Sequence, residues 1–117
     1  MTNSDHARAR FITLVYELDQ IEKKPDPGAV QYNAGVDRLR DFVRSWSRDE
    51  VTEILTPLMT AEPPIRGTAA GFLLNMGIAT DDALTVLREL ASKVDEYEQA
   101  AFDAGDVLMV WEREQHK

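Results

Sequence analysis

Pairs of carboxylates are the groups in this chain whose spacing could support catalysis. Glu50 and Glu53 are three residues apart, as are Asp103 and Asp106, so each pair shares one face if its segment is helical. Carboxylates on neighbouring helices are suitable ligands for Mg²⁺. The two pairs are distant in the sequence, however, and no phosphate-binding loop accompanies them. A solvated helix surface explains them more simply, and a divalent-metal-dependent hydrolase remains the alternative.

Other catalytic groups are scarce. The two histidines, His6 and His116, are near the ends of the sequence, where we expect frayed structure that cannot hold a reactive geometry. No serine lies in a Gly-x-Ser-x-Gly turn, and the absence of cysteine excludes disulfides, thiolate metal sites and cysteine nucleophiles. We therefore predict a protein that is not an enzyme and that carries no metal or cofactor.

Three arginines, Arg40, Arg44 and Arg48, follow one another at i,i+4 spacing. Stacked on one helix, they could bind a phosphate or an acidic partner. Asp37 and Asp41 alternate with them at i,i+3, as on a helix surface that neutralises itself. We therefore expect these arginines to be solvated.

The net charge of −8 is concentrated in the second part of the chain. Residues 1–50 hold 8 Lys and Arg against 9 Asp and Glu, a balance of −1, and residues 51–117 hold 5 against 12, a balance of −7. An acidic segment repels phosphate backbones, so we do not expect a nucleic acid partner. No apolar run approaches the ~20 residues that cross a bilayer, and the first arginines precede no apolar export segment. We expect a cytoplasmic protein without membrane contact.

Acidic residues near the C-terminus form the most distinctive predicted surface. If residues 96–113 are helical, these carboxylates lie opposite an apolar stripe, or along its edges. A solubilising outer face explains the set without a partner, whereas a docking face for a basic protein also explains the charge difference between the two parts of the chain. The candidate partner-binding residues are Asp95, Glu96, Glu98, Asp103, Asp106 and Glu112.

Six helical segments can position these residues. Apolar residues recur at helical spacing, and the residues between the segments are typical of helix ends. Ser47 and Glu50 match a capping box, Pro57 should shorten the third helix, and Thr80 is the expected N-cap of the fifth. Residues 107–111 could instead form a buried strand, but no second strand is available to pair with it. The segments are residues 5–24, 27–46, 47–59, 63–77, 80–94 and 96–113.

An internal repeat relates the later segments. At an offset of 32 residues, Val51 and Leu55 align with Ala83 and Leu87, and at an offset of 35, Leu73 aligns with Leu108. A proline turn, an aliphatic-Arg pair and paired alanines follow in order at Pro63, Ile65-Arg66 and Ala69-Ala70. This order is similar to the HEAT consensus, and the chain resembles small bacterial HEAT-like families of uncharacterised function.

The resemblance implies an α-solenoid scaffold over about residues 49–112, and such scaffolds bind partners more often than they catalyse. It also implies a structural role for Arg66. The second copy departs from the pattern, because Ala101 stands at the position that matches Arg66. In the first copy, Glu62 is the only acid in the turn before Arg66.

The sequence as a whole predicts an all-α single domain, a short HEAT-like or armadillo-like helical repeat of about six helices. Residues 1–46 would form an N-terminal helical hairpin that caps the repeat, residues 47–77 the first pair, and residues 78–113 a second, degenerate pair. The predicted function is a non-catalytic protein–protein interaction module whose acidic face engages a basic protein, as an adaptor or an immunity-type inhibitor. The alternatives are the metal-dependent hydrolase and a self-associating structural unit, such as a homodimer.

Overall fold

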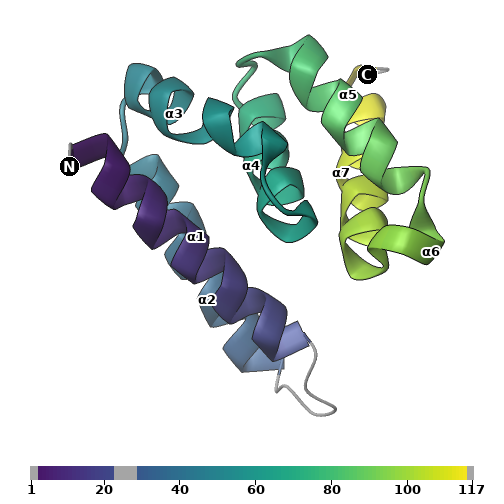
Figure 1. Ribbon diagram of the computed structural model, residues 1–117, viewed down its shortest axis with the longest axis horizontal. Coiled ribbons are helices and arrows are strands. Elements are labelled where there is room, and N and C mark those ends of the chain that lie inside the picture. The colour runs from purple at the N-terminus through teal and green to yellow at the C-terminus, as the bar shows by residue number, and fades with distance from the viewer. Residues whose placement is uncertain (1–2, 23–28, 116–117) are drawn as a thin grey trace. The chain divides into compact units, whose positions relative to one another are not determined.

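Every regular element in the described part of the protein is helical. The computed structural model describes residues 3–22 and 29–115, and within these ranges it contains seven α-helices, one 3-10 helix and no strand (Figure 1). The all-α prediction is therefore confirmed, whereas the expected number of about six helices is too low. The chain divides into two compact units, Met1–Ile54 and Leu55–Lys117.

The first unit is built on a hairpin of two antiparallel helices, α1 (Asn3–Glu22) and α2 (Ala29–Arg44), which lie side by side (Figure 1). Their apolar residues face each other at helical spacing, as the sequence predicts. Val30, in the first turn of α2, is 80% exposed. The predicted boundary between the first two segments, at residues 24–27, lies outside the described residues. The buried side chains of the hairpin are Phe11, Leu14, Val15, Leu39 and Val43.

Gly35 lies on the face of α2 that packs against α1. A Cβ atom at this position would lie only 2.6 Å from Cδ2 of Leu18, closer than two non-bonded carbon atoms approach. The Leu18 side chain therefore packs directly against the α2 backbone at this point and would have to move if residue 35 carried a side chain. This close packing offsets part of the cost of a glycine within a helix.

The third helix, α3 (Arg48–Leu55), begins with the predicted capping box. The Ser47 amide donates to Glu50 Oε1 at 2.8 Å, and the Glu50 amide donates to Ser47 Oγ at 3.2 Å. At the other end, Arg8 of α1 donates from Nε to the Ile54 carbonyl and from Nη2 to the Glu53 carbonyl, both at 2.9 Å. Carbonyls in the last turn of a helix have no amide partner within that helix, so these bonds satisfy them and connect α3 to α1.

The second unit places four small residues where its helices meet. Ala69, Ala70, Ala101 and Ala104 are at most 2% exposed, so α4 and α7 can approach closely without a clash. Leucines on α4 and α5 fill the remaining core. The elements of this unit are η1 (Thr56–Thr60), α4 (Pro63–Asn75), α5 (Thr80–Ala91), α6 (Val94–Tyr97) and α7 (Gln99–Gln115). Residues 107–111 lie within α7, which confirms helix rather than strand there.

Proline and glycine mark the helix ends of this unit. Pro57 ends the α-helical path, and the 3-10 helix η1 follows directly on α3, as its position predicts. After α4, Gly77 has a φ of 69°, its amide donates to the Leu74 carbonyl, and the Ile78 amide donates to the Leu73 carbonyl. This pair of bonds is a Schellman motif, in which glycine tolerates the left-handed conformation.

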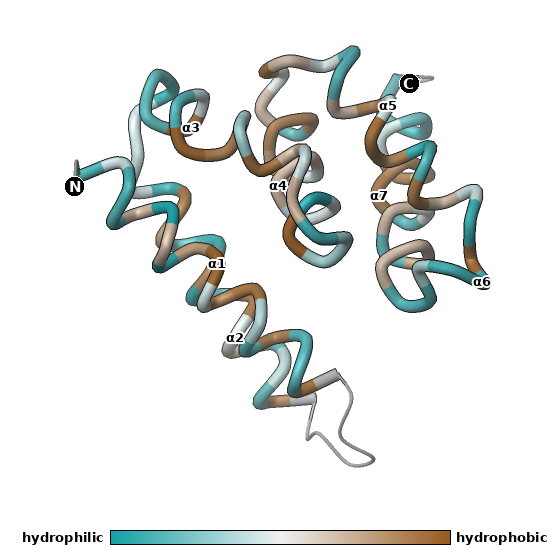
Figure 2. Tube along the Cα trace, viewed as in Figure 1, coloured by the Kyte–Doolittle hydropathy of each residue, from teal (hydrophilic) through white to brown (hydrophobic). Residues whose placement is uncertain are grey.

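Two predicted boundaries in the second unit are wrong. Thr80 is not the N-cap of α5, because Ala79, with a φ of 48°, occupies that position and Thr80 is already helical. The expected helix over residues 96–113 is interrupted at Glu98, whose φ of 49° and ψ of −117° no helix can accommodate. The interruption leaves α6 as a separate turn, which accounts for the additional helix. Figure 2 shows α6 as a short, mainly hydrophilic segment that joins α5 to α7.

Candidate interaction surface

The predicted catalytic groups do not come together within the described ranges. No three His, Asp or Glu side chains in residues 3–22 and 29–115 are arranged to hold a metal ion. Glu50 is engaged in the α3 capping box, and the pair it forms with Glu53 belongs to the first unit, whereas Asp103 and Asp106 belong to the second. His6 is an exposed residue of α1 rather than of a frayed end, and His116 lies outside the described residues.

The arginine series is divided between two helices. Because α2 ends at Arg44, Arg48 begins α3 instead of adding a further turn to the same face, so this predicted stacking is wrong. Arg40 Nη1 is 3.8 Å from Asp37 Oδ1, and both side chains are largely exposed. Such a surface pair is worth little free energy, in agreement with the solvated surface that the sequence predicts.

Arg66 on α4 is largely buried, with its side chain 18% exposed. Its Nη1 donates to the Ala61 carbonyl at 3.3 Å, and its guanidinium lies 5.3 Å from the centre of the Tyr97 ring. Its Nη2 is 3.7 Å from Glu89 Oε2 on α5. Arg66 thereby joins α4 to α5 by an ion pair and to α6 by a cation–π contact, and its hydrogen bond holds the turn before α4.

Glu89 is the centre of this cluster, which we name the α6 anchor and which consists of Arg66, Glu89, Lys93 and Tyr97. The Tyr97 hydroxyl donates to Glu89 Oε1 at 2.8 Å, and Lys93 Nζ is 3.8 Å from the same oxygen. Lys93 also lies 5.9 Å from the centre of the Tyr97 ring. The α6 anchor fixes Tyr97 against α5 directly before the break at Glu98, and so fixes where α7 begins.

The six predicted partner-binding residues are all exposed, but they do not share one face. Asp95 and Glu96 lie on α6 and Glu98 lies at the break, whereas the other three lie on α7. Asp103 and Asp106 are less than one turn apart on the outer side of α7. Glu112 is nine residues from Asp103, about two and a half turns, and therefore lies on the opposite side of the helix.

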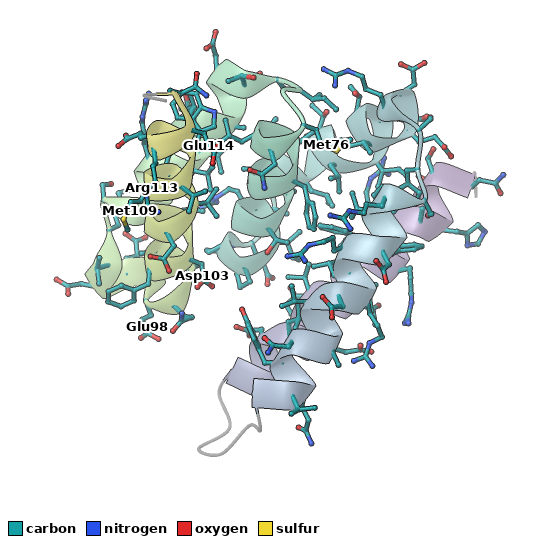
Figure 3. All side chains as sticks on the ribbon, turned by 180° about the vertical axis from the view of Figure 1, so that it is seen from behind. Met76, Glu98, Asp103, Met109, Arg113 and Glu114 are labelled. Carbon is teal, nitrogen blue, oxygen red and sulfur yellow. The ribbon has the colours of Figure 1, made fainter. Side chains whose placement is uncertain are left out.

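Apolar side chains accompany the acids on the outer side of α7. Phe102, Met109 and Val110 are 59%, 52% and 51% exposed, whereas Ala101 and Ala104 on the inner side are buried. Figure 3 shows Asp103, Met109 and Arg113 projecting from the α7 ribbon. Asp103 accepts a hydrogen bond from Gln99 Nε2 at 3.0 Å. We name this surface the outer ridge, and it consists of Phe102, Asp103, Asp106, Met109, Val110 and Arg113.

The outer ridge combines two properties of a protein-binding surface. Apolar side chains supply contact area, and flanking charges supply orientation and selectivity. The sequence analysis identified its acids but missed its apolar members, although a helical projection of residues 99–115 puts Phe102, Asp106 and Val110 at successive i,i+4 positions. That projection was the available signal.

Two further findings bear on function. None of the described helices is long and apolar enough to cross a bilayer. No protein-family model, curated protein or solved structure matches this chain.

Proposed function

We propose that this protein is a non-catalytic interaction module that binds a basic protein through the acidic and apolar outer side of α7. The observation that carries this proposal is the exposure of Phe102, Met109 and Val110 beside Asp103 and Asp106 on one regular helix. Scattered single apolar residues are ordinary on a protein surface, but three along about two turns of one helix face are typical of a contact surface.

The charge of the second unit supports a basic partner. Residues 55–117 hold 11 Asp and Glu against 5 Lys and Arg, a balance of −6. Negative potential over such a surface accelerates encounter with a positive partner and disfavours acidic competitors. The proposal centres on Asp103 and Asp106, with Glu98 at the start of the same helix and Asp95 and Glu96 on the preceding turn. Glu112, on the opposite side of α7, is the least favourably placed of the predicted residues.

The short HEAT-like repeat is part of the same proposal. Its support is local: the proline at the start of α4, the structural arginine Arg66, and the paired alanines Ala69 and Ala70, which are fully buried. A scaffold of this kind holds its binding helix rigid, so that the partner meets a preformed surface.

The test is capture of a partner by immobilised protein from a lysate of the source cells, with elution by increasing salt. We expect one basic protein in stoichiometric amount that is released by salt, because exposed charges are screened within about 10 Å at 0.1 M ionic strength. Charge reversal of Asp103 and Asp106 to lysine should abolish capture, whereas Glu112→Lys, a matched change on the opposite side of α7, should preserve it. Equal capture by both variants would contradict the proposal.

A further inference from the structure

The spacing of the apolar residues on the outer ridge defines the shape of what covers it. Phe102 and Met109 are seven residues apart and Phe102 and Val110 eight, so the apolar contact extends about 12 Å along the helix at 1.5 Å per residue. Adjacent ridges of a helix surface pack into the grooves of a second helix at this periodicity. Two to three turns of a partner helix therefore match the length of the apolar surface.

The charges on the outer ridge define the chemistry of that helix. Asp106 lies four residues from both Phe102 and Val110, so a carboxylate is present within the apolar contact itself, and Asp103 lies less than one turn before Asp106. An apolar partner helix without cations would leave the Asp106 carboxylate partly desolvated without a positive charge opposite it, which is unfavourable. A helix with Lys or Arg beside its apolar stripe pairs with both acids instead. Arg113, at the far end, disfavours cations there and so favours one orientation.

A second copy of this chain is a less suitable occupant. In a two-fold interface each surface meets itself, so the outer ridge would face an identical surface. An antiparallel pairing would set Arg113 of each copy near Asp103 of the other, but Asp103 and Asp106 outnumber Arg113, so the excess of negative charge would still be doubled within one interface. Like charges brought together in this way oppose association.

We propose that the outer ridge binds a basic amphipathic helix, whose apolar residues contact Phe102, Met109 and Val110 while its Lys or Arg side chains pair with Asp103 and Asp106. This inference rests on the proposed function and adds to it the secondary structure and the charge pattern of the partner segment. The recognition mode is a helix that lays its apolar stripe against an apolar surface, with i,i+3/i+4 and i+7 anchors.

The probe is a synthetic helical peptide of about 20 residues, with Leu at i, i+3, i+4 and i+7 positions and Lys elsewhere. A scrambled peptide of the same composition tests whether binding needs the amphipathic pattern. A peptide with Glu in place of every Lys tests whether binding needs positive charge. Binding to the full-length protein is measured by fluorescence anisotropy at low and physiological salt. The protein variants are Phe102→Ser with Met109→Ser, Asp106→Asn, and Glu112→Gln as the matched charge control.

We expect the Lys-Leu peptide to bind more tightly than either control peptide. The double Phe102→Ser, Met109→Ser variant should lose about tenfold or more in affinity, Asp106→Asn about two- to fivefold, and Glu112→Gln none. Circular dichroism of each variant verifies that the helices are intact. Equal weakening by Asp106→Asn and Glu112→Gln, or equal binding of the scrambled peptide, would overturn the inference in favour of general electrostatic attraction.

Two outcomes separate this inference from the function on which it rests. If the lysate partner is captured through Asp103 and Asp106 but no peptide binds, the helical partner is refuted and the interaction module stands. If sedimentation shows a dimer that the double serine variant dissociates, a second copy occupies the outer ridge and the inference is overturned.

Discussion

Replacement of Glu98 by glycine should stabilise the second unit. Glu98 has a φ of 49° and a ψ of −117°, a conformation in which a side chain is strained and glycine is not. Residues held in such regions cost on the order of 1–3 kcal/mol. Glycine also gains freedom in the unfolded chain, which offsets about 0.4–1 kcal/mol of the relief. The expected net gain is therefore about 1 kcal/mol.

The gain is measured as a rise in the urea midpoint and as an increase of about 4 °C in Tm for a chain of this size. Glu98→Gln is the matched control, because it removes the charge and retains a Cβ, and it should leave both values unchanged. Two backbone bonds hold this position: the Glu98 amide donates to the Val94 carbonyl at 2.8 Å, and the Ala101 amide donates to the Glu98 carbonyl at 3.0 Å. Both can form with glutamate, glutamine or glycine at residue 98. If the glycine variant is no more stable than the glutamine variant, α6 and α7 are not joined through a strained residue.

Further substitutions test other features by urea unfolding. Arg66→Ala should lose about 1–2 kcal/mol, because it removes the bond to Ala61 and the contacts with Glu89 and Tyr97. Gly71→Ala should gain about 1 kcal/mol, since its Cβ would lie an unstrained 3.8 Å from Val107, whereas Gly77→Ala should lose about as much at its φ of 69°. Ser47→Ala should lose about 1 kcal/mol with the capping box. The role of Arg66 or of Ser47 is contradicted if its alanine variant has an unchanged urea midpoint. The roles of the two glycines are contradicted if Gly71→Ala lowers the midpoint or Gly77→Ala raises it.

Local signals predicted the helices well. The Ser47–Glu50 capping box, the interruption at Pro57 and the start of α4 at Pro63 all involve bonds or constraints within a few residues, so the sequence contains the whole cause. Burial at helical spacing was also predictable, as the fully buried Val51, Ile54 and Leu55 show.

Features that depend on distant residues were not predictable in this way. The break at Glu98 coincides with the bond between Tyr97 and Glu89, eight residues earlier in the chain, and nothing around Glu98 itself signals a helix end. Val94, the last residue of the predicted fifth segment, is 41% exposed, because α5 ends at Ala91 and Val94 begins α6. For the candidate surface, the acids were identified and a helical projection could also have placed Phe102 and Val110 beside Asp106, but the division of the acids by the break required the structure.

The α6 anchor has a consequence for the order in which this unit opens. Tyr97, Lys93 and Arg66 all contact the carboxylate of Glu89, so loss of that one group removes a hydrogen bond and two ion pairs and leaves only cation–π contacts on Tyr97. Segments with few buried contacts open well below the free energy of global unfolding, and α6 has no buried residue. Amide hydrogen exchange should therefore be fastest from residue 94 to residue 98. Because Phe102 lies one turn beyond this segment, a ligand on the outer ridge should slow exchange there, and deuterium uptake at α6 would report occupancy of a surface that it does not itself form.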